Sequence, residues 1–238
     1  FERAAAFTNP GYAPHPLSAG PLHPASSLQR LQVSGGAHRG RRLVTPSVYM
    51  RPMMSRVREA LFSMLYPTRV LRDSAQALDI FAGSGVVGIE ALSRGVGSAT
   101  FIDFSPVCAA TIRANLERFG VAARGQVVEA RAEEFLARPE RYGVARPFDV
   151  VTLTPPYEEV VYSELMAQLA ASPVLGEDSI VVVEYPVELG GFPQVLADGT
   201  LIGLRDRRYG RTVLAVYVCQ PSGKLDLDAR SEEFVQMM

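Results

Sequence analysis

The chain has 238 residues, of which 47% are hydrophobic and 21% charged, and its formal net charge at pH 7 is −1. This length and apolar content predict one substantial core, and the balanced charge argues against a uniformly basic protein that coats nucleic acid. Cys108 and Cys219 show neither CxxC spacing nor a disulfide pattern, and no apolar run approaches the roughly 20 residues of a membrane span. We therefore expect no metal site, no membrane contact and a reducing compartment.

Positive charge is concentrated near the N-terminus, where residues 1–58 contain eight arginines but only one acid, Glu2. An anionic partner would meet this end of the chain first. Residues 1–29 are rich in Pro, Ala, Ser and Gly, which predicts a flexible extension that contributes nothing to the core.

Residues 30–66 are expected to form a small basic appendage. Short apolar runs around three glycines predict a β-hairpin with a basic turn, and apolar residues at helical spacing predict a helix over 55–66. Arg56 and Arg58 are expected to project from the other faces of this helix, so the appendage would present its charge to an anionic partner.

From residue 76 onward, apolar runs alternate with helical stretches. Strands are predicted at 77–81, 99–104, 126–128, 148–153 and 179–185. Helices are predicted near 86–94, 106–119, 131–138 and 159–171. This alternation predicts an α/β protein with a doubly wound, mostly parallel, Rossmann-like sheet covered on both faces.

Two further apolar runs, 200–205 and 212–219, are joined by a link too short for a crossover helix. They predict an antiparallel hairpin at one sheet edge, which gives seven strands in all. Residues 67–220 would then form the main domain, and the polar, acidic residues 221–238 a tail or an appended helix.

A glycine-rich turn follows the first predicted strand, where residues 78–88 read LDIFAGSGVVG. Glycines at positions 83, 85 and 88 let a ligand approach the backbone and permit positive φ. Asp103 ends the next strand, where a carboxylate can accept hydrogen bonds from the two hydroxyls of a ribose. Together these features predict a nucleoside-binding crevice.

The spacing of the three glycines also fits a dinucleotide, so a nicotinamide or flavin enzyme is an alternative, as is a tight turn without a ligand. Asp79 decides between the ligands, because its charge would repel a pyrophosphate but suits the cationic amino-acid end of S-adenosylmethionine. We therefore expect a methyl donor. The residues expected to contact it in this segment are Asp79, Phe81, Gly83, Ser84, Gly85 and Gly88, joined by Asp103.

The sequence Thr154-Pro155-Pro156-Tyr157 follows the fourth strand, at the carboxyl edge where open α/β sheets bind ligands. Tyr157 can stack on a base pulled out of its helix, and the Thr154 hydroxyl and Pro155 carbonyl can accept hydrogen bonds from an exocyclic amine. Those bonds would aim the amine lone pair at a sulfonium methyl group without a covalent enzyme intermediate. The alternative is that the two prolines only shape the loop and that Tyr157 is a packing residue. The loop could present the exocyclic amine of either adenine or guanine.

In this order, the motifs resemble the RsmD family of ribosomal RNA guanine-N2 methyltransferases, in an organellar or plant-type form, over residues 31–217. Besides the two loops, the resemblance rests on the motifs Ser34-Gly35-Gly36, Arg39-Gly40-Arg41, Arg51-Pro52, 56–62, 90–95, Glu184 and Arg208-Tyr209-Gly210. It implies a monomeric enzyme that methylates the N2 of one guanine on the small ribosomal subunit. The chain begins at Phe1 rather than Met, and with the plant-type appearance this leads us to expect a chloroplast location, with the cytoplasm as the alternative.

By this resemblance, five arginines would face RNA phosphates or the target nucleotide: Arg39, Arg41, Arg42, Arg51 and Arg56. The alternative for each is an intramolecular ion pair. The chain departs from the family pattern at Thr154, where Asp or Asn is usual, and at Arg131, where an acid commonly marks the adenine edge. Adenine contacts are therefore expected from the backbone around Ala132 and from Phe104, unless Phe104 packs into the core.

Three other functions remain open from the sequence. One is a nicotinamide oxidoreductase that uses the same glycine turn. A second is a catalytically silent RNA-binding relative. The third is a methyltransferase that acts on adenine, a protein or a small molecule, of which the basic N-terminal region disfavours the small molecule.

Overall fold

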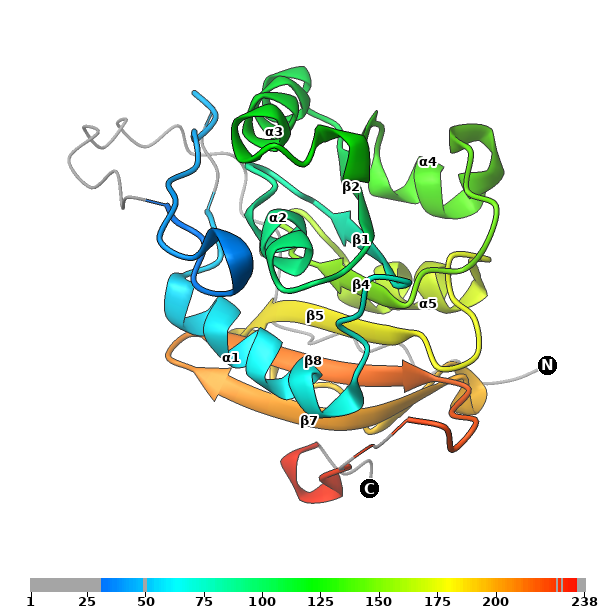
Figure 1. Cartoon of the computed structure of the whole chain (residues 1–238). Coiled ribbons are helices and arrows are strands. Elements are labelled where there is room, and N and C mark those ends of the chain that lie inside the picture. The colour runs from blue at the N-terminus through cyan, green and yellow to red at the C-terminus, as the bar shows by residue number, and fades with distance from the viewer. Residues whose placement is uncertain (1–30, 49–50, 226, 228, 235–238) are drawn as a thin grey trace.

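The computed structural model describes residues 31–48, 51–225, 227 and 229–234. The extension expected over 1–29 lies outside these residues. Eight strands form one sheet in the order β3-β2-β1-β4-β5-β8-β7-β6 (Figure 1). They are β1 (Gln76–Ile80), β2 (Ser98–Asp103), β3 (Gly125–Glu129), β4 (Val150–Leu153), β5 (Ile180–Pro186), β6 (Val195–Leu196), β7 (Leu201–Tyr209) and β8 (Thr212–Cys219).

The first five strands are parallel, and β8, β7 and β6 add to the edge in antiparallel pairs. The predicted doubly wound sheet with an antiparallel hairpin is confirmed. The sheet has one strand more than predicted, because the two residues of β6 are too few to show an alternating pattern. Strand β7 also runs to Tyr209, four residues beyond its predicted end at 205.

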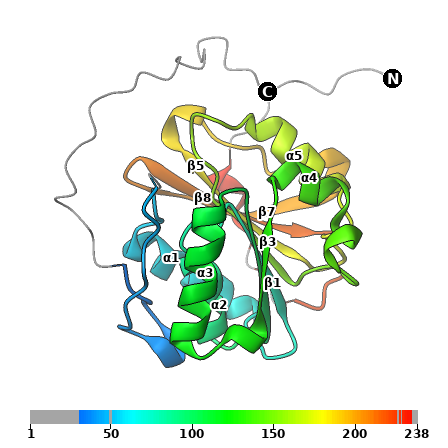
Figure 2. The same ribbon diagram turned by 90° about the horizontal axis from the view of Figure 1, so that it is seen from above.

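The described residues form five α-helices that cover the sheet: α1 (Ser55–Leu65), α2 (Val86–Ser93), α3 (Pro106–Phe119), α4 (Ala132–Ala137) and α5 (Tyr162–Ala171). Buried residues of α1, α2 and α3 form one core on one face, and those of α4 and α5 form a second core on the other (Figure 2). Alternate strand residues enter the two cores; Val182 belongs to the first and Val183 to the second. No helix among the described residues has the length and apolar character needed to cross a bilayer.

The expected N-terminal hairpin is present as a short ladder. Gln32 and Arg42 form an antiparallel bridge, and the Leu43 N–H donates to the Leu31 carbonyl at 2.9 Å. The turn contains a short 3-10 helix, Gly36–His38, that packs on the end of α2. A Cβ on Gly36 would lie 2.0 Å from the Ser93 carbonyl oxygen, so this close approach requires glycine.

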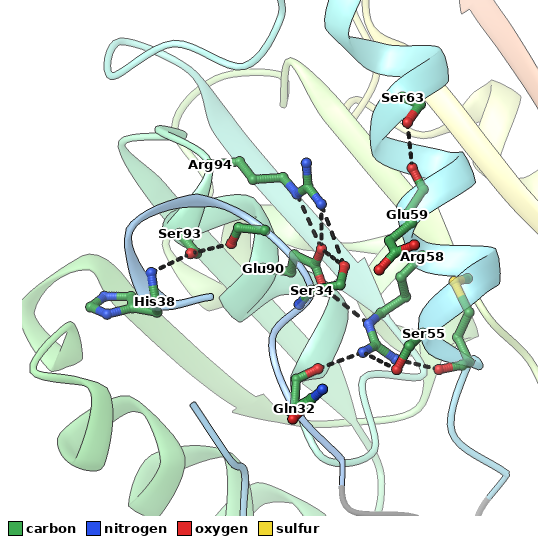
Figure 3. A network of polar contacts seen from close by, with 12 residues as sticks. Gln32, Ser34, His38, Ser55, Arg58, Glu59, Ser63, Glu90, Ser93 and Arg94 are labelled. Carbon is green, nitrogen blue, oxygen red and sulfur yellow. Dashed lines mark hydrogen bonds and ion pairs between the residues drawn. The ribbon is translucent and has the colours of Figure 1, made fainter. Parts of the chain in front are cut away.

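A buried ion pair joins the N-terminal appendage to the main domain (Figure 3). The Arg58 guanidinium, 0% exposed, donates from Nε to Glu90 Oε2 at 3.0 Å and from Nη2 to the Gln32 carbonyl at 2.6 Å. Glu90 also accepts from Arg94 at 2.8 Å and from the Ser34 hydroxyl. The prediction that Arg58 projects from an outer face of the helix is therefore wrong.

The described part of the C-terminal segment folds back onto β7 as a short 3-10 helix, Ser231–Glu233. Glu233 accepts hydrogen bonds from the Asp206 N–H at 3.0 Å and from Arg207 Nε at 3.2 Å. Phe234 is 5% exposed, and its ring lies 5.6 Å from that of Tyr217. This segment therefore covers the hairpin edge of the sheet.

Candidate active site

The glycine loop, residues 81–85, leaves β1 at the carboxyl edge of the parallel strands. Phe81, Gly83 and Gly85 have φ values of 64°, 56° and 76°. A left-handed conformation at Phe81, which has a side chain, costs about 1–3 kcal/mol and is typical of functional loops. The loop thus holds a strained backbone path at the carboxyl edge of the sheet.

Asp103, at the end of β2, fixes the glycine loop. Its two carboxylate oxygens accept from the Gly83 N–H at 2.8 Å and from the Ser105 N–H at 2.9 Å. An ionised carboxylate offers about four lone-pair sites, so two remain for donors from a ligand. The geometry therefore suits the predicted contact of Asp103 with ribose hydroxyls.

Asp79 lies beneath the loop, and only 1% of the residue is exposed. Its carboxylate accepts from the Gly88 N–H at 2.9 Å and from the Thr152 hydroxyl at 3.0 Å. Burial raises the pKa of Asp79 to about 7, and these two hydrogen bonds oppose the shift. The structure thus gives Asp79 a role in joining β1, β4 and α2, and its direct contact with a cofactor stays a prediction.

Gly88 and Ser84 serve different purposes. A Cβ on Gly88 would lie 2.3 Å from the Phe101 ring, so glycine is required here for α2 to pack on β2. Ser84 is 0% exposed, and its hydroxyl is the one buried side-chain polar atom in the described residues without a hydrogen-bond partner. An unsatisfied hydroxyl costs about 1–3 kcal/mol, which marks this loop as a place where a ligand atom fits.

Phe104 is 59% exposed, so the alternative that it packs into the core is wrong. The guanidinium of Arg131 lies 5.6 Å from the centroid of its ring. Ala132, 5% exposed, begins α4 immediately after Arg131. Because Asp103 pairs with Glu129 across β2 and β3, these residues lie at the same sheet edge as the glycine loop.

The proline loop, residues 154–157, leaves β4 beside the glycine loop. The Thr154 hydroxyl donates to the Phe81 carbonyl at 3.2 Å and so joins the two loops directly. Its oxygen keeps lone pairs for a further donor. Pro155 is buried and Pro156 is exposed, so the two prolines lie in different environments.

Tyr157 is held by side chains from three distant segments. Its hydroxyl donates to Glu184 Oε1 at 2.8 Å and lies 2.9 Å from the Thr212 hydroxyl oxygen. The Arg51 guanidinium lies 4.6 Å from the centroid of the Tyr157 ring and donates to Thr212 at 3.4 Å. The alternative that Tyr157 serves only as packing does not account for these polar contacts.

Glu184 and Thr212 are the site residues that the sequence interpretation did not assign. Glu184 entered only through the family resemblance, and Thr212 not at all, because 55 positions separate it from Tyr157. Burial raises the pKa of Glu184, while the hydrogen bond from Tyr157 and the charge of Arg51 lower it. The available signal was a single acid near the carboxyl end of an otherwise apolar strand, β5.

The five arginines expected to face RNA are not equivalent. Arg51 reaches the proline loop, whereas Arg41 bonds to the Arg118 carbonyl and lies 4.6 Å from the Phe119 ring centroid. The other three, Arg39, Arg42 and Arg56, are exposed and form no ion pair with any described residue. The ion-pair alternative therefore has no support at those three positions in the described part of the chain.

The chain is similar in sequence to a family of known proteins. A family model described as conserved hypothetical protein 95 matches residues 31–218. The chain belongs to this family, the RsmD family. Ribosomal RNA small subunit methyltransferase D from Escherichia coli K12 is 34% identical over 209 residues, which are 87% of this chain and 98% of that protein. The putative rRNA methyltransferase YlbH of Bacillus subtilis is 32% identical over 79% of this chain and 98% of its own length.

A solved structure agrees with the RsmD family assignment. The putative methyltransferase yhhF from Escherichia coli matches with a TM-score of 0.67 at 33% identity, covering 80% of this chain and 98% of that chain. The fold is thus a Rossmann-like methyltransferase fold. In this member of the RsmD family, Thr154 joins the glycine loop to the proline loop. Both loops lie at the carboxyl edge of the parallel strands.

Proposed function

We propose that this member of the RsmD family transfers a methyl group to the exocyclic N2 of one guanine in small-subunit ribosomal RNA. The observation that carries the proposal is the 3.2 Å hydrogen bond from Thr154 to the Phe81 carbonyl. It joins a glycine loop suited to the methyl donor to a proline loop suited to a flipped base. Donor and acceptor would therefore meet in one crevice.

S-adenosylmethionine is the cofactor, and it supplies an electrophilic methyl group. The residues present fit it: Asp103 has lone pairs free for ribose hydroxyls, Phe104 offers an exposed ring for an adenine, and the Ser84 hydroxyl lacks a partner. The left-handed turns at Gly83 and Gly85 leave the backbone open to close approach. We propose the backbone around Ala132 as a further contact for the adenine.

The chain's own residues then have to orient an amine that is a poor nucleophile, because its lone pair is delocalised into the base. The Thr154 hydroxyl uses its proton on Phe81, so its oxygen faces the amine only as an acceptor. The Pro155 carbonyl would accept the second amine hydrogen. Tyr157, held at its hydroxyl, would present its ring to the base, a contact worth about 1–3 kcal/mol.

The names of the curated relatives support ribosomal RNA as the substrate. The exposed arginines Arg39, Arg42 and Arg56 would bind its phosphates, and Arg51 would act near the target nucleotide. A monomeric state and a chloroplast location, with the cytoplasm as the alternative, stay predictions. Gel filtration and a fluorescent fusion would test them.

The proposal is tested by incubating the protein with labelled S-adenosylmethionine and small ribosomal subunits from cells that lack their own enzyme of this family. Nuclease digestion and mass spectrometry should find N2-methylguanosine at one position. A Tyr157→Ala variant that still binds the cofactor is the control and should give little product. Methylated adenine, methylated protein, or RNA binding without any product would contradict the proposal.

A further inference from the structure

Glu184 is a carboxylate buried beside the proline loop, with 7% of the residue exposed. It pairs with Leu214 across β5 and β8, and Leu214 and Val182 both belong to the core that contains α1. Glu184 thus faces the side of the sheet where Arg51 and the N-terminal appendage lie. No cation among the described residues lies within ion-pair distance of it.

Glu184 accepts hydrogen bonds from the side chains packed around it. The Tyr157 hydroxyl donates to Glu184 Oε1, and the Thr212 hydroxyl also bonds to this carboxylate and lowers its pKa. Arg51 in turn donates to Thr212 at 3.4 Å. An ionised carboxylate offers about four lone-pair sites, so Glu184 keeps sites for a further donor.

We infer that Glu184 selects guanine by accepting a hydrogen bond from the N1–H of the target base, an inference that rests on the proposed guanine-N2 function. The Watson–Crick edge of guanine carries two adjacent donors, N1–H and the N2 amine. Adenine places a lone pair at N1 beside its amine, and that lone pair repels a carboxylate. A flipped base is read by hydrogen bonds to this edge, so an acceptor here distinguishes the two purines.

The strand register places Thr154 and Glu184 where one could bind the N2 amine and the other the N1–H of the same base. Leu153 pairs with Val183 across β4 and β5, so Thr154 and Glu184 follow next to each other on neighbouring strands. Such strands lie about 4.8 Å apart. With the N2 amine held at Thr154, the adjacent N1–H would point toward Glu184. The proline loop alone accepts an amine from either purine, and Glu184 supplies the discrimination.

The inference is tested by replacing the target guanine, in RNA joined from synthetic segments, with 2-aminopurine. This base keeps the N2 amine but has a lone pair at N1. The wild type should favour guanine in kcat/KM by about 10- to 150-fold, the range for one hydrogen bond to a charged group. Glu184→Gln keeps an oxygen for Tyr157 and adds an N–H donor, so it should lose activity on guanine and gain activity on 2-aminopurine.

Glu188→Gln is the matched control, because Glu188 is exposed, lies just beyond β5 and pairs with Arg211. It should leave both activities unchanged. Equal wild-type activity on the two bases, or an equal loss on both in Glu184→Gln, would overturn the inference and leave the proposed function standing. Equal wild-type activity on the two bases overturns the inference even if Glu184→Gln does not fold. Absence of N2-methylated guanine from the wild-type reaction would instead refute the proposed function.

Discussion

Arg58 and Glu90 form an ion pair 3.0 Å long in which both side chains are 0% exposed. Removal of one partner from such a pair leaves an uncompensated buried charge and costs about 3–5 kcal/mol. The pair also connects α1 to α2, the helix that begins at the glycine loop. The pair therefore sets the position of the N-terminal appendage relative to the glycine loop.

Arg58→Met is expected to lower the free energy of unfolding by up to about 3–5 kcal/mol, because the buried Glu90 then keeps only Arg94 as a cationic partner. Urea denaturation measures this change. The double variant Arg58→Met, Glu90→Gln should lose less than the sum of the two single losses. Arg56→Met, on the exposed side of the same helix, is the control and should change stability by less than about 0.5 kcal/mol. Strictly additive losses would contradict a buried pair.

The buried carboxyl group of Asp79 should make the stability of the protein depend on pH. Its folded pKa of about 7 lies above the ordinary aspartate value of 3.8, so between these pH values the folded state holds a proton that the unfolded state has lost. The contribution of Asp79 to the free energy of unfolding is therefore fully present below about pH 4. It is lost as pH rises toward 7, which lowers the free energy of unfolding by up to about 4 kcal/mol. Asp79→Asn should show a flatter decline in urea denaturation over this range. An Asp79→Asn curve parallel to that of the wild type, or one that an exposed-site control, Asp73→Asn, reproduces, would refute this assignment.

Local patterns predicted the sheet and the loops, whereas long-range side-chain contacts escaped them. The glycine loop and the proline loop each occupy one short segment, and every strand except β6 was visible as an apolar run. Tyr157, by contrast, meets Arg51 and Thr212 through tertiary packing, and no local signal encodes that meeting.

Arg58 shows that a signal can be present and misread. It stands three, four and seven positions before Leu61, Phe62 and Leu65, which are all buried. This spacing places Arg58 on the buried face of the helix. The assumption that charge lies outward overrode the periodicity, because a buried arginine is rare unless an acid such as Glu90 pairs with it.

Thr154→Val should lower kcat about 10-fold with little change in KM for the cofactor, because it removes one neutral hydrogen-bond partner of the amine and the bond to Phe81. Thr154→Asn restores an acceptor and should retain or raise the rate. Thr111→Val is the control, since its hydroxyl also bonds a backbone carbonyl, that of Val107 at 2.8 Å, but on α3. Methylation unaffected by Thr154→Val would show that the hydroxyl takes no part in orienting the amine.

Glu184 should give methylation an acidic limb in its pH profile. Acceptance of N1–H requires the ionised carboxylate, and burial raises the pKa of Glu184. As pH falls through this raised pKa, kcat/KM on guanine should decline at a higher pH than an ordinary glutamate would cause. The groups that oppose the shift are Arg51, Tyr157 and Thr212. An identical acidic limb in the residual activity of Glu184→Gln would assign the titration to another group.

Arg42 and Arg41 are neighbours with different surroundings, and they separate RNA binding from structure. Arg42 is exposed and pairs with no described acid, so Arg42→Gln should weaken RNA binding and lower the slope of log K against log salt by about 1. Arg41 bonds to the Arg118 carbonyl and packs on Phe119, so Arg41→Gln should lower the free energy of unfolding by about 1 kcal/mol. Filter binding across a salt series and urea denaturation measure the two effects. If Arg42→Gln keeps the wild-type salt slope, its guanidinium contacts no phosphate, and the RNA path must run over another part of the surface.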